Sequence, residues 1–398
     1  MAPRFIKQTD AVTRMTLRGI TGRAGQAVAV VLSIAIVVAV MIAFLSMADG
    51  FERTVNGAGS PDVAMVLRSN AGAELNSSVS LEAVKVLSDA PGIAHDGAGK
   101  PLVSPELYVI ADGIKKDTGL STNVPLRGMT PAGIALRGNV DIIAGRAFTP
   151  GLNELMVGRS AEAQYEGLAL DSTVKLGPTT WKVVGIFSTG GSVFESEIWT
   201  DAKLVQEVFH RGSGYQIMRA RLDGPGALEK LNAFIAGDVR LKELGAETET
   251  AYYAKQSKAI ANVIRYLGYP LSIVMALGAL AGALNSMYSS VAARGREIAT
   301  LRAIGFGGFP TFVGTMVESV ILSLVGGFAG VAFAWLFFDG LSAATLGSSF
   351  TQVVFDLHVS STLVTNGMML AVIVGLAGGF FPAMRAARQP LVAAFRDE

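Results

Sequence analysis

Four long apolar segments constrain the fold of this chain more than any other feature of its sequence. The first contains no ionisable side chain between Arg23 and Asp49. A helix of about 20 mostly apolar residues is long enough to cross the hydrocarbon core of a membrane. The sequence therefore predicts four transmembrane helices, within residues 24–48, 266–293, 303–338 and 359–384.

The composition supports membrane spans joined to a soluble part. Of the 398 residues, 51% are hydrophobic and only 16% are charged, which is more apolar than an ordinary soluble protein. The net charge of +1 gives no reason to expect a nucleic-acid partner. The chain has no cysteine, and its histidines lack metal-ligand spacing, so we expect no disulfide and no metal site. The histidines are His95, His210 and His358.

Basic residues predict the orientation, because Lys and Arg gather on the cytoplasmic side of membrane proteins. They form three basic flanks, before the first segment, between the second and third, and after the fourth, whereas the loop 339–358 has none. We therefore expect both termini in the cytoplasm and residues 49–260 outside. The first segment is longer than a signal peptide's apolar core, so we expect an uncleaved anchor. The basic residues are Arg4, Lys7, Arg14, Arg18 and Arg23; Arg294, Arg296 and Arg302; and Arg385, Arg388 and Arg396.

The region outside the membrane mixes strand and helix patterns, which predicts a large α+β domain inserted between the first two spans. We expect two subdomains, with a Gly/Pro/Thr-rich break near residues 117–133. Strands are predicted within 61–68, 106–111, 153–158, 172–177, 180–187 and 215–222, and helices within 80–92, 160–168, 200–210 and 226–237.

These signals give the following division of the chain. We predict a cytoplasmic amphipathic lead at 1–23, transmembrane helix 1 at 24–48, the extracytoplasmic domain at 49–260, a stalk with transmembrane helix 2 at 261–290, a cytoplasmic coupling segment at 291–310, transmembrane helix 3 at 311–338, an extracytoplasmic loop at 339–360, transmembrane helix 4 at 361–384 and a cytoplasmic tail at 385–398.

The charged stretch 292-AARGREIATLRAIGFG-307 lies between the second and third apolar segments. On a helix, Ile298 and Leu301 share one side and form a small apolar ridge, with charged residues on other sides. Such a ridge fits a groove in another protein. Alternatively, the arginines only set the topology. The residues considered for docking are Arg294, Arg296, Glu297, Ile298, Leu301 and Arg302.

Catalytic motifs are not apparent in the sequence, and we assign no catalytic residue. The loop 189-TGGSVFESE-197 is best interpreted as a Gly-rich turn. The chain also lacks the phosphate-binding pattern G-x-x-x-x-G-K-[ST]. Any ATP-driven role therefore requires a second polypeptide.

Small residues four positions apart recur in the apolar segments, where they allow close helix packing within one bundle or across a dimer. Glu318 is ionisable and lies within the third segment, where we favour a structural hydrogen-bonding role over a proton pathway. Pro270 predicts either a kink or the start of a separate helix. The glycine pairs are Gly278 with Gly282, Gly326 with Gly330, and Gly375 with Gly379.

The membrane part resembles the permease domain of the FtsX and MacB type. The resemblance rests on 285-NSMYSSVAARGREIATLRAIGFGG-308, on 317-VESVILSLVGGFAG-330 and on the closing 379-GFFPAMRAARQPLVAAFR-396. Residues 153–201 resemble the periplasmic core domain of that family, and 13-TRMTLRGITGRAGQ-26 resembles its amphipathic lead.

The resemblance implies a type VII ABC permease with a core domain of Porter-like and Sabre-like parts. It implies a partner ATPase that binds ATP and Mg, a second permease protomer in a homodimer or a heterodimer, and either a membrane-fusion protein or an outer-membrane component. Some members carry an ATPase domain before the first span, and we do not expect one here, because only residues 1–23 precede that span. The implied function is mechanotransmission that drives export or extraction; the alternative is FtsX-like regulation of a cell-wall hydrolase without transport.

Overall fold

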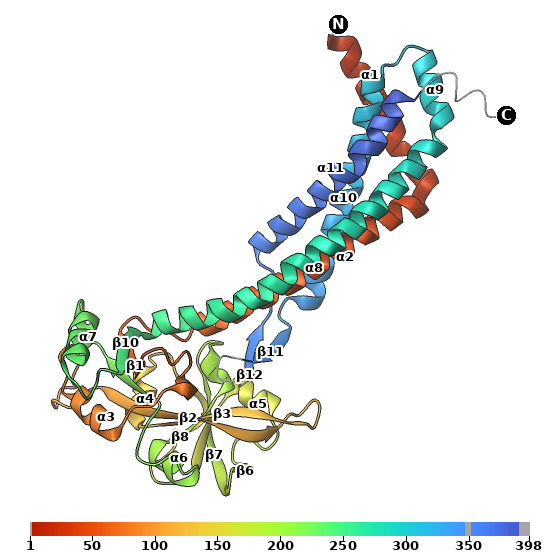
Figure 1. Cartoon of the computed structure of the whole chain (residues 1–398). Coiled ribbons are helices and arrows are strands. Elements are labelled where there is room, and N and C mark those ends of the chain that lie inside the picture. Colours follow the sequence, from red (N-terminus) through yellow and green to blue (C-terminus); the bar gives the residue numbers. More distant parts are fainter. Residues whose placement is uncertain (1, 347–351, 390–398) are drawn as a thin grey trace. The chain divides into compact units, whose positions relative to one another are not determined.

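The computed structural model describes residues 2–346 and 352–389, which form two compact units (Figure 1). The first, called the helical unit, contains residues up to Ala48, Val263–Leu341 and the part of the chain from Leu357 onward. The second, called the sheet unit, contains Asp49–Asn262 and Ser342–Asp356. Two long helices, α2 and α8, have residues in both units.

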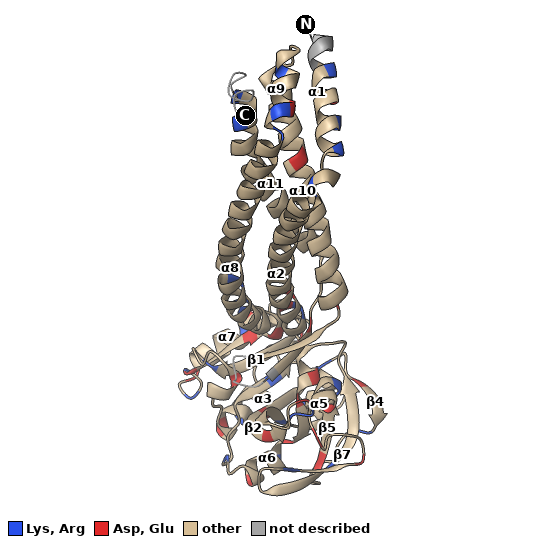
Figure 2. Cartoon of the chain, turned by 90° about the vertical axis from the view of Figure 1, so that its right-hand side faces the viewer, with Lys and Arg blue, Asp and Glu red and all other residues tan. Residues whose placement is uncertain are grey.

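The described residues contain four helices that are long and apolar enough to cross a membrane, and they include all four predicted segments. Charged side chains of the helical unit gather on two shorter helices, α1 and α9 (Figure 2). The helices are α1 (Ala2–Arg18), α2 (Ala24–Asn56), α8 (Glu249–Ala293), α9 (Gly295–Ala303), α10 (Gly308–Phe338) and α11 (Ser361–Arg388), with a 3-10 turn, η1, at Thr21–Arg23.

Glycines allow the helices of the helical unit to pack closely. A Cβ atom added at Gly330 would lie 2.5 Å from the carbonyl oxygen of Ala35 on α2, and one at Gly326 would lie 2.8 Å from that of Val31. Gly375 and Gly379 lie similarly against α10, which runs beside α11 (Figure 1). By contrast, a Cβ added at Gly278 would meet no described atom within 4 Å.

The sheet unit is built on one mixed sheet of ten strands. Its order is β10-β1-β9-β2-β3-β8-β5-β7-β4, and β6 also pairs with β7. The strands are β1 (Val63–Arg68), β2 (Val103–Ile114), β3 (Ser121–Met129), β4 (Asp141–Gly145), β5 (Glu154–Gly158), β6 (Thr173–Leu176), β7 (Thr179–Ser188), β8 (Ile198–Asp201), β9 (Ile217–Arg221) and β10 (Leu244–Thr248).

One face of this sheet carries two apolar cores, which helices of six to eleven residues help to bury. Val66, Met218 and Ala220 belong to a core with helices α3 and α7. Val109 and Leu126 belong to a core with α5 and α6. The helices of this unit are α3 (Leu81–Ser88), α4 (Pro131–Leu136), α5 (Arg159–Gln164), α6 (Ala202–Val208) and α7 (Ala227–Gly237), with 3-10 turns η2 (Glu74–Asn76) and η3 (Val193–Ser196).

Three predictions need correction. The proposed break at residues 117–133 is wrong, because it contains β3, a strand in the middle of the sheet. The loop predicted at 339–360 contains paired strands, β11 (Ser342–Leu346) and β12 (Gln352–Asp356), which belong to the sheet unit. Pro270 lies inside the continuous helix α8, so it does not start a separate helix.

Substituting Gly330 with alanine tests the close packing of α10 on α2. The new methyl group would collide with the Ala35 carbonyl, and overpacking of this kind costs about 1–3 kcal/mol of unfolding free energy. We expect Gly330→Ala to lower the unfolding temperature in detergent. The control is Gly25→Ala, whose added Cβ would meet no described atom within 4 Å. Equal unfolding temperatures for both variants would contradict this packing.

Candidate functional site

Arg294 is the residue that joins the long helix α8 to the short helix α9. It precedes Gly295, the first residue of α9, and its side chain is only 9% exposed. Sequence reasoning placed it on the docking segment, among the charged residues that lie on other sides of the helix from Ile298 and Leu301. The structure instead directs it into the helical unit.

Arg294 and Arg23 hold Glu318 between them, and these three residues form the helical-unit cluster. A guanidinium nitrogen of each arginine lies 3.4 Å from a different carboxylate oxygen of Glu318. Arg294 also donates a hydrogen bond of 2.7 Å to the hydroxyl of Thr16 on α1, and Arg23 contacts the hydroxyl of Ser290 on α8. Because a buried charge is costly without a partner, this cluster fixes α1, α8 and α10 to the residue that precedes α2.

The prediction that Ile298 forms part of an exposed apolar ridge on α9 is wrong. Its side chain is only 2% exposed and packs against Val291 and Ala386. Leu301 is half-buried. Arg302 donates hydrogen bonds to the carbonyl oxygens of Ala387 and Gln389, at 3.3 and 2.5 Å. Helical spacing correctly separated Ile298 from the charged side chains of α9. The side of the helix that carries Ile298 packs against α11 and is not exposed.

The exposed face of α9 carries different residues. Arg296, Glu297 and Thr300 are exposed on the helix, and Ile304, its C-cap residue, is 69% exposed. Spacing of about four residues places Arg296, Thr300 and Ile304 along one side. If α9 contacts another protein in this conformation, it therefore does so through the face that carries Arg296, Thr300 and Ile304.

A second group of buried charges, the sheet-unit cluster, lies on the face of the sheet opposite the apolar cores. Its register places Arg219 beside Ser104 on β2, and Arg127 beside Tyr108. Since side chains alternate along a strand, Arg219, Glu106 and Arg127 share this face on adjacent strands. The whole cluster, each member less than 5% exposed, consists of Glu74, Glu106, Arg127, Arg137, Glu197, Arg219 and Glu249.

Glu106 is the centre of the sheet-unit cluster because it contacts all three arginines. Its nitrogen–oxygen distances are 3.1 Å to Arg127, 2.7 Å to Arg137 and 3.1 Å to Arg219. Burial alone would raise the pKa of Glu106, but the charges of Arg137 and Arg219 lower it to about 2. Arg127 also holds Glu197 through two bonds of 2.7 Å. The carboxylate of Glu106 is thus ionised near neutral pH.

Helix α8 begins in this cluster. Glu249, its first residue, pairs with Arg219 and accepts a hydrogen bond of 3.1 Å from the backbone N–H of Ser60. The hydroxyl of Tyr253 accepts one of 3.0 Å from Arg219, and that of Tyr252 accepts one of 3.1 Å from the backbone N–H of Glu74. The first turn of α8 is therefore positioned by directed polar contacts.

Sequence reasoning did not predict that either group of charged residues lies together. Arg23 was used only to predict topology, and the charged residues of the sheet face were not considered, since they lie far apart in the chain. Part of the loop 189–197 does form a turn with left-handed glycines, as interpreted, but Glu197 at its end belongs to the sheet-unit cluster. Within the described ranges 2–346 and 352–389, no group of three or more metal-ligating side chains is found.

Comparison with known families identifies the class of protein. The MacB-like periplasmic core domain matches residues 27–236, more than half of the chain, and the FtsX-like permease C-terminal domain matches residues 270–391. The chain therefore belongs to the MacB/FtsX-like family of ABC transporter permeases, and residues 49–236 of its sheet unit lie within the match to the periplasmic core domain.

Individual relatives are distant. An uncharacterized ABC transporter permease of Methanocaldococcus jannaschii is 23% identical over 58% of this chain and 58% of its own length. The macrolide export ATP-binding/permease protein MacB of Shewanella oneidensis is 26% identical over 58% of this chain and 35% of its own length. The chain thus matches little more than half of the first relative and about a third of the second. The solved extracellular domain of the transporter YknZ from Gram-positive bacteria is 14% identical, covering 47% of this chain and all of that domain, with a TM-score of 0.35.

Glu318 and Glu297 provide a matched test of the helical-unit cluster. Both carboxylates lie 3.4 Å from Arg294, but the Glu318 side chain is 4% exposed and that of Glu297 is 54% exposed. Removing one partner of a buried ion pair costs about 3 kcal/mol or more, whereas an exposed pair is worth less than about 1 kcal/mol. We expect Glu318→Gln to lower the unfolding temperature clearly and Glu297→Gln to leave it nearly unchanged. Similar losses in both variants would show that the cluster has no special role.

Proposed function

We propose that this chain is the permease subunit through which a separate ABC ATPase moves an extracytoplasmic domain, and that this movement drives export or extraction of a substrate. In this proposal the partner binds ATP and Mg, and the chain itself contributes no catalytic group. The membrane is a bacterial inner membrane with both termini in the cytoplasm, as the basic flanking residues predict. A membrane-fusion protein or outer-membrane component would complete an export route.

The observation that carries this proposal is the continuity of helix α8 between two ion clusters. Its 45 residues run without interruption from Glu249, in the sheet-unit cluster, to Ala293, which precedes Arg294 in the helical-unit cluster. Separating a buried ion pair is strongly unfavourable. A displacement of α9 would therefore carry Arg294 and Glu318 with it rather than break their contact, and α8 would move as well.

The ATPase would contact the exposed face of α9, where Arg296, Thr300 and Ile304 lie. This assignment keeps the predicted docking segment but replaces its buried ridge residue Ile298. Arg296 and Glu297 supply charges at the rim, and Ile304 supplies an apolar side chain of the kind that anchors an interface. Binding of ATP by the partner shifts the permease only to the extent that the partner binds one permease conformation more tightly.

A second protomer would pack on the outward face of α8. Only 22% of the most apolar stretch of α8 is buried, compared with 44% for the corresponding stretches of α2 and α11. Gly278 has open space beside it, and Gly282 meets only the Ser33 hydroxyl at 3.9 Å. Glycines four residues apart allow two helix backbones to approach closely in a membrane.

Charge placed on the exposed face of α9 tests the docking surface. Ile304 is 69% exposed, and Leu120, between β2 and β3 in the sheet unit, is a control that is 67% exposed. We expect Ile304→Asp to reduce co-purification of the ATPase at least tenfold, because an interfacial charge would lose its water. Leu120→Asp should leave the complex intact. Retention of the ATPase by Ile304→Asp at normal levels would contradict the docking assignment.

Single-cysteine crosslinking tests the protomer contact, since the chain has no cysteine of its own. We expect Gly278→Cys to form disulfide-linked dimers in native membranes. The control is Leu336→Cys on α10, where the native side chain is 70% exposed. If both positions crosslink equally, or if only position 336 does, then α8 is not the dimer contact.

A further inference from the structure

A cavity of about 560 Å³ lies in the sheet unit, beside the end of the β2–β3 hairpin. Strand β6 and the residues that follow α5 also line it. Apart from one tyrosine hydroxyl its buried lining is apolar, whereas its exposed rim carries Asp112, Glu166 and Lys175. Ligand sites in proteins have this size and combine an apolar interior with a few polar groups. The buried apolar residues are Val124, Leu168, Leu176 and Ile198.

Tyr165 lines this cavity and supplies that hydroxyl. The residue follows α5, and its backbone pairs with Lys115, just beyond β2. Its side chain is only 1% exposed, and its ring lies against β2, where a Cβ atom added at Gly113 would be 3.6 Å from the ring. The hydroxyl is buried and has no hydrogen-bond partner among the residues that the structure describes. Since buried hydroxyls normally have one, the cavity that Tyr165 lines is the place where a partner fits.

The chemistry of the lining limits what that partner is. Burial raises the pKa of Tyr165 to about 12, so the hydroxyl keeps its proton near neutral pH and can donate it in a hydrogen bond. Its complement is an acceptor atom, such as a carbonyl oxygen. No charged side chain belongs to the described buried lining, and an ion placed there would lose its water without meeting an opposite charge. These conditions favour an uncharged, mostly apolar molecule that carries an acceptor.

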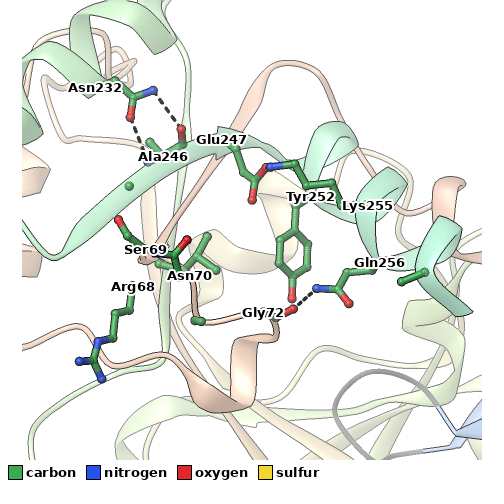
Figure 3. Close-up of a pocket in the computed structure, with 14 residues that line it drawn as sticks. Arg68, Ser69, Asn70, Gly72, Asn232, Ala246, Glu247, Tyr252, Lys255 and Gln256 are labelled. Carbon is green, nitrogen blue, oxygen red and sulfur yellow. Dashed lines mark hydrogen bonds and ion pairs between the residues drawn. The ribbon is translucent and has the colours of Figure 1, made fainter.

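A recess of similar size in the same unit differs in this respect. It has a volume of about 520 Å³ and lies beside β10 and the first turns of α8 (Figure 3). Its polar side chains contact protein groups. Asn232 forms two hydrogen bonds with the backbone of Ala246, and Lys255 pairs with Glu247. Among the described side chains that line the recess, none has a buried polar atom without a partner. The unpartnered hydroxyl, rather than size, therefore distinguishes the cavity beside Tyr165.

We propose that the cavity beside Tyr165 binds an uncharged, lipophilic small molecule, and that the Tyr165 hydroxyl donates a hydrogen bond to an acceptor oxygen of this molecule. Val124, Leu176 and Ile198 contact its apolar body. Identification of this molecule as the exported or extracted substrate rests on the proposed function, whereas binding in the cavity does not.

Photolabelling of the full chain in lipid nanodiscs tests this site. The probe is benzophenone, an uncharged apolar molecule whose carbonyl oxygen accepts a hydrogen bond and which, under near-ultraviolet light, couples to C–H bonds beside it. Peptide mass spectrometry then locates the labelled residues. In the parent we expect labels at Val124 or Leu176 and none at Ala246, in the recess of Figure 3. Tyr165→Phe should lower labelling of the cavity about fivefold, the change in affinity expected for loss of one hydrogen bond.

The unfolding temperature without the probe distinguishes a ligand-binding hydroxyl from a structural one. Removing an unpartnered buried hydroxyl leaves no group unsatisfied, so Tyr165→Phe should be at least as stable as the parent. The matched control is Tyr252→Phe, which removes a hydroxyl that accepts a hydrogen bond of 3.1 Å from the backbone N–H of Glu74. This variant should have a lower unfolding temperature and retain labelling of the cavity.

Three results would overturn the proposal. If the residues that line the cavity are not labelled, the cavity holds water only. If the parent and Tyr165→Phe are labelled equally, the hydroxyl does not bind the probe. If Tyr165→Phe lowers the unfolding temperature as much as Tyr252→Phe, the hydroxyl already has a structural partner. None of these measurements involves the ATPase or nucleotide, so a failure here is distinguishable from failure of the proposed function.

Discussion

A buried charge must be paired with an opposite charge, and helix α8 has a group of buried ion pairs at each of its ends. At its first residue, Glu249 enters a group of three arginines and three other glutamates. Just beyond its last residue, Arg294 shares Glu318 with Arg23. Because paired charges inside a protein resist separation far more than apolar surfaces resist sliding, both ends of the helix are tied to specific residues. The account of the whole chain follows from these two attachments.

The remaining contacts of the helical unit are of a different kind. Gly326 and Gly330 bring α10 against the backbone of α2, and Gly375 and Gly379 bring α11 against α10. Such contacts depend on close approach of backbones and contain no charge. They favour a firmly packed body, and Ala279 and Ala283 of α8 belong to the same apolar core. In the proposed mechanism, this body and α9 respond together to the ATPase.

Much of the fold follows from the pattern of the sequence. Apolar length predicted the four long helices, and alternation predicted six of the strands, because both signals are local. Strand β3 escaped because Pro125, Arg127 and Gly128 give it the composition of a turn, and Arg127 is buried only because distant glutamates neutralise it. The segment considered for docking does contain a helix, but helical spacing alone could not tell whether Ile298 is exposed or packs against Ala386 of the same chain. Pairing between residues hundreds of positions apart, as between Arg23 and Glu318, leaves no local signal.

The most direct test of the central claim is a nucleotide-dependent distance measurement in the assembled transporter. Spin labels within the sheet unit would be followed in nanodiscs that contain the permease and its ATPase, first with ADP and then with a non-hydrolysable ATP analogue. The account predicts that the distance distribution changes with nucleotide in the parent. It predicts no change in Glu318→Gln, even when the ATPase remains bound and hydrolyses ATP. A full nucleotide-dependent change in Glu318→Gln would contradict transmission through the helical-unit cluster.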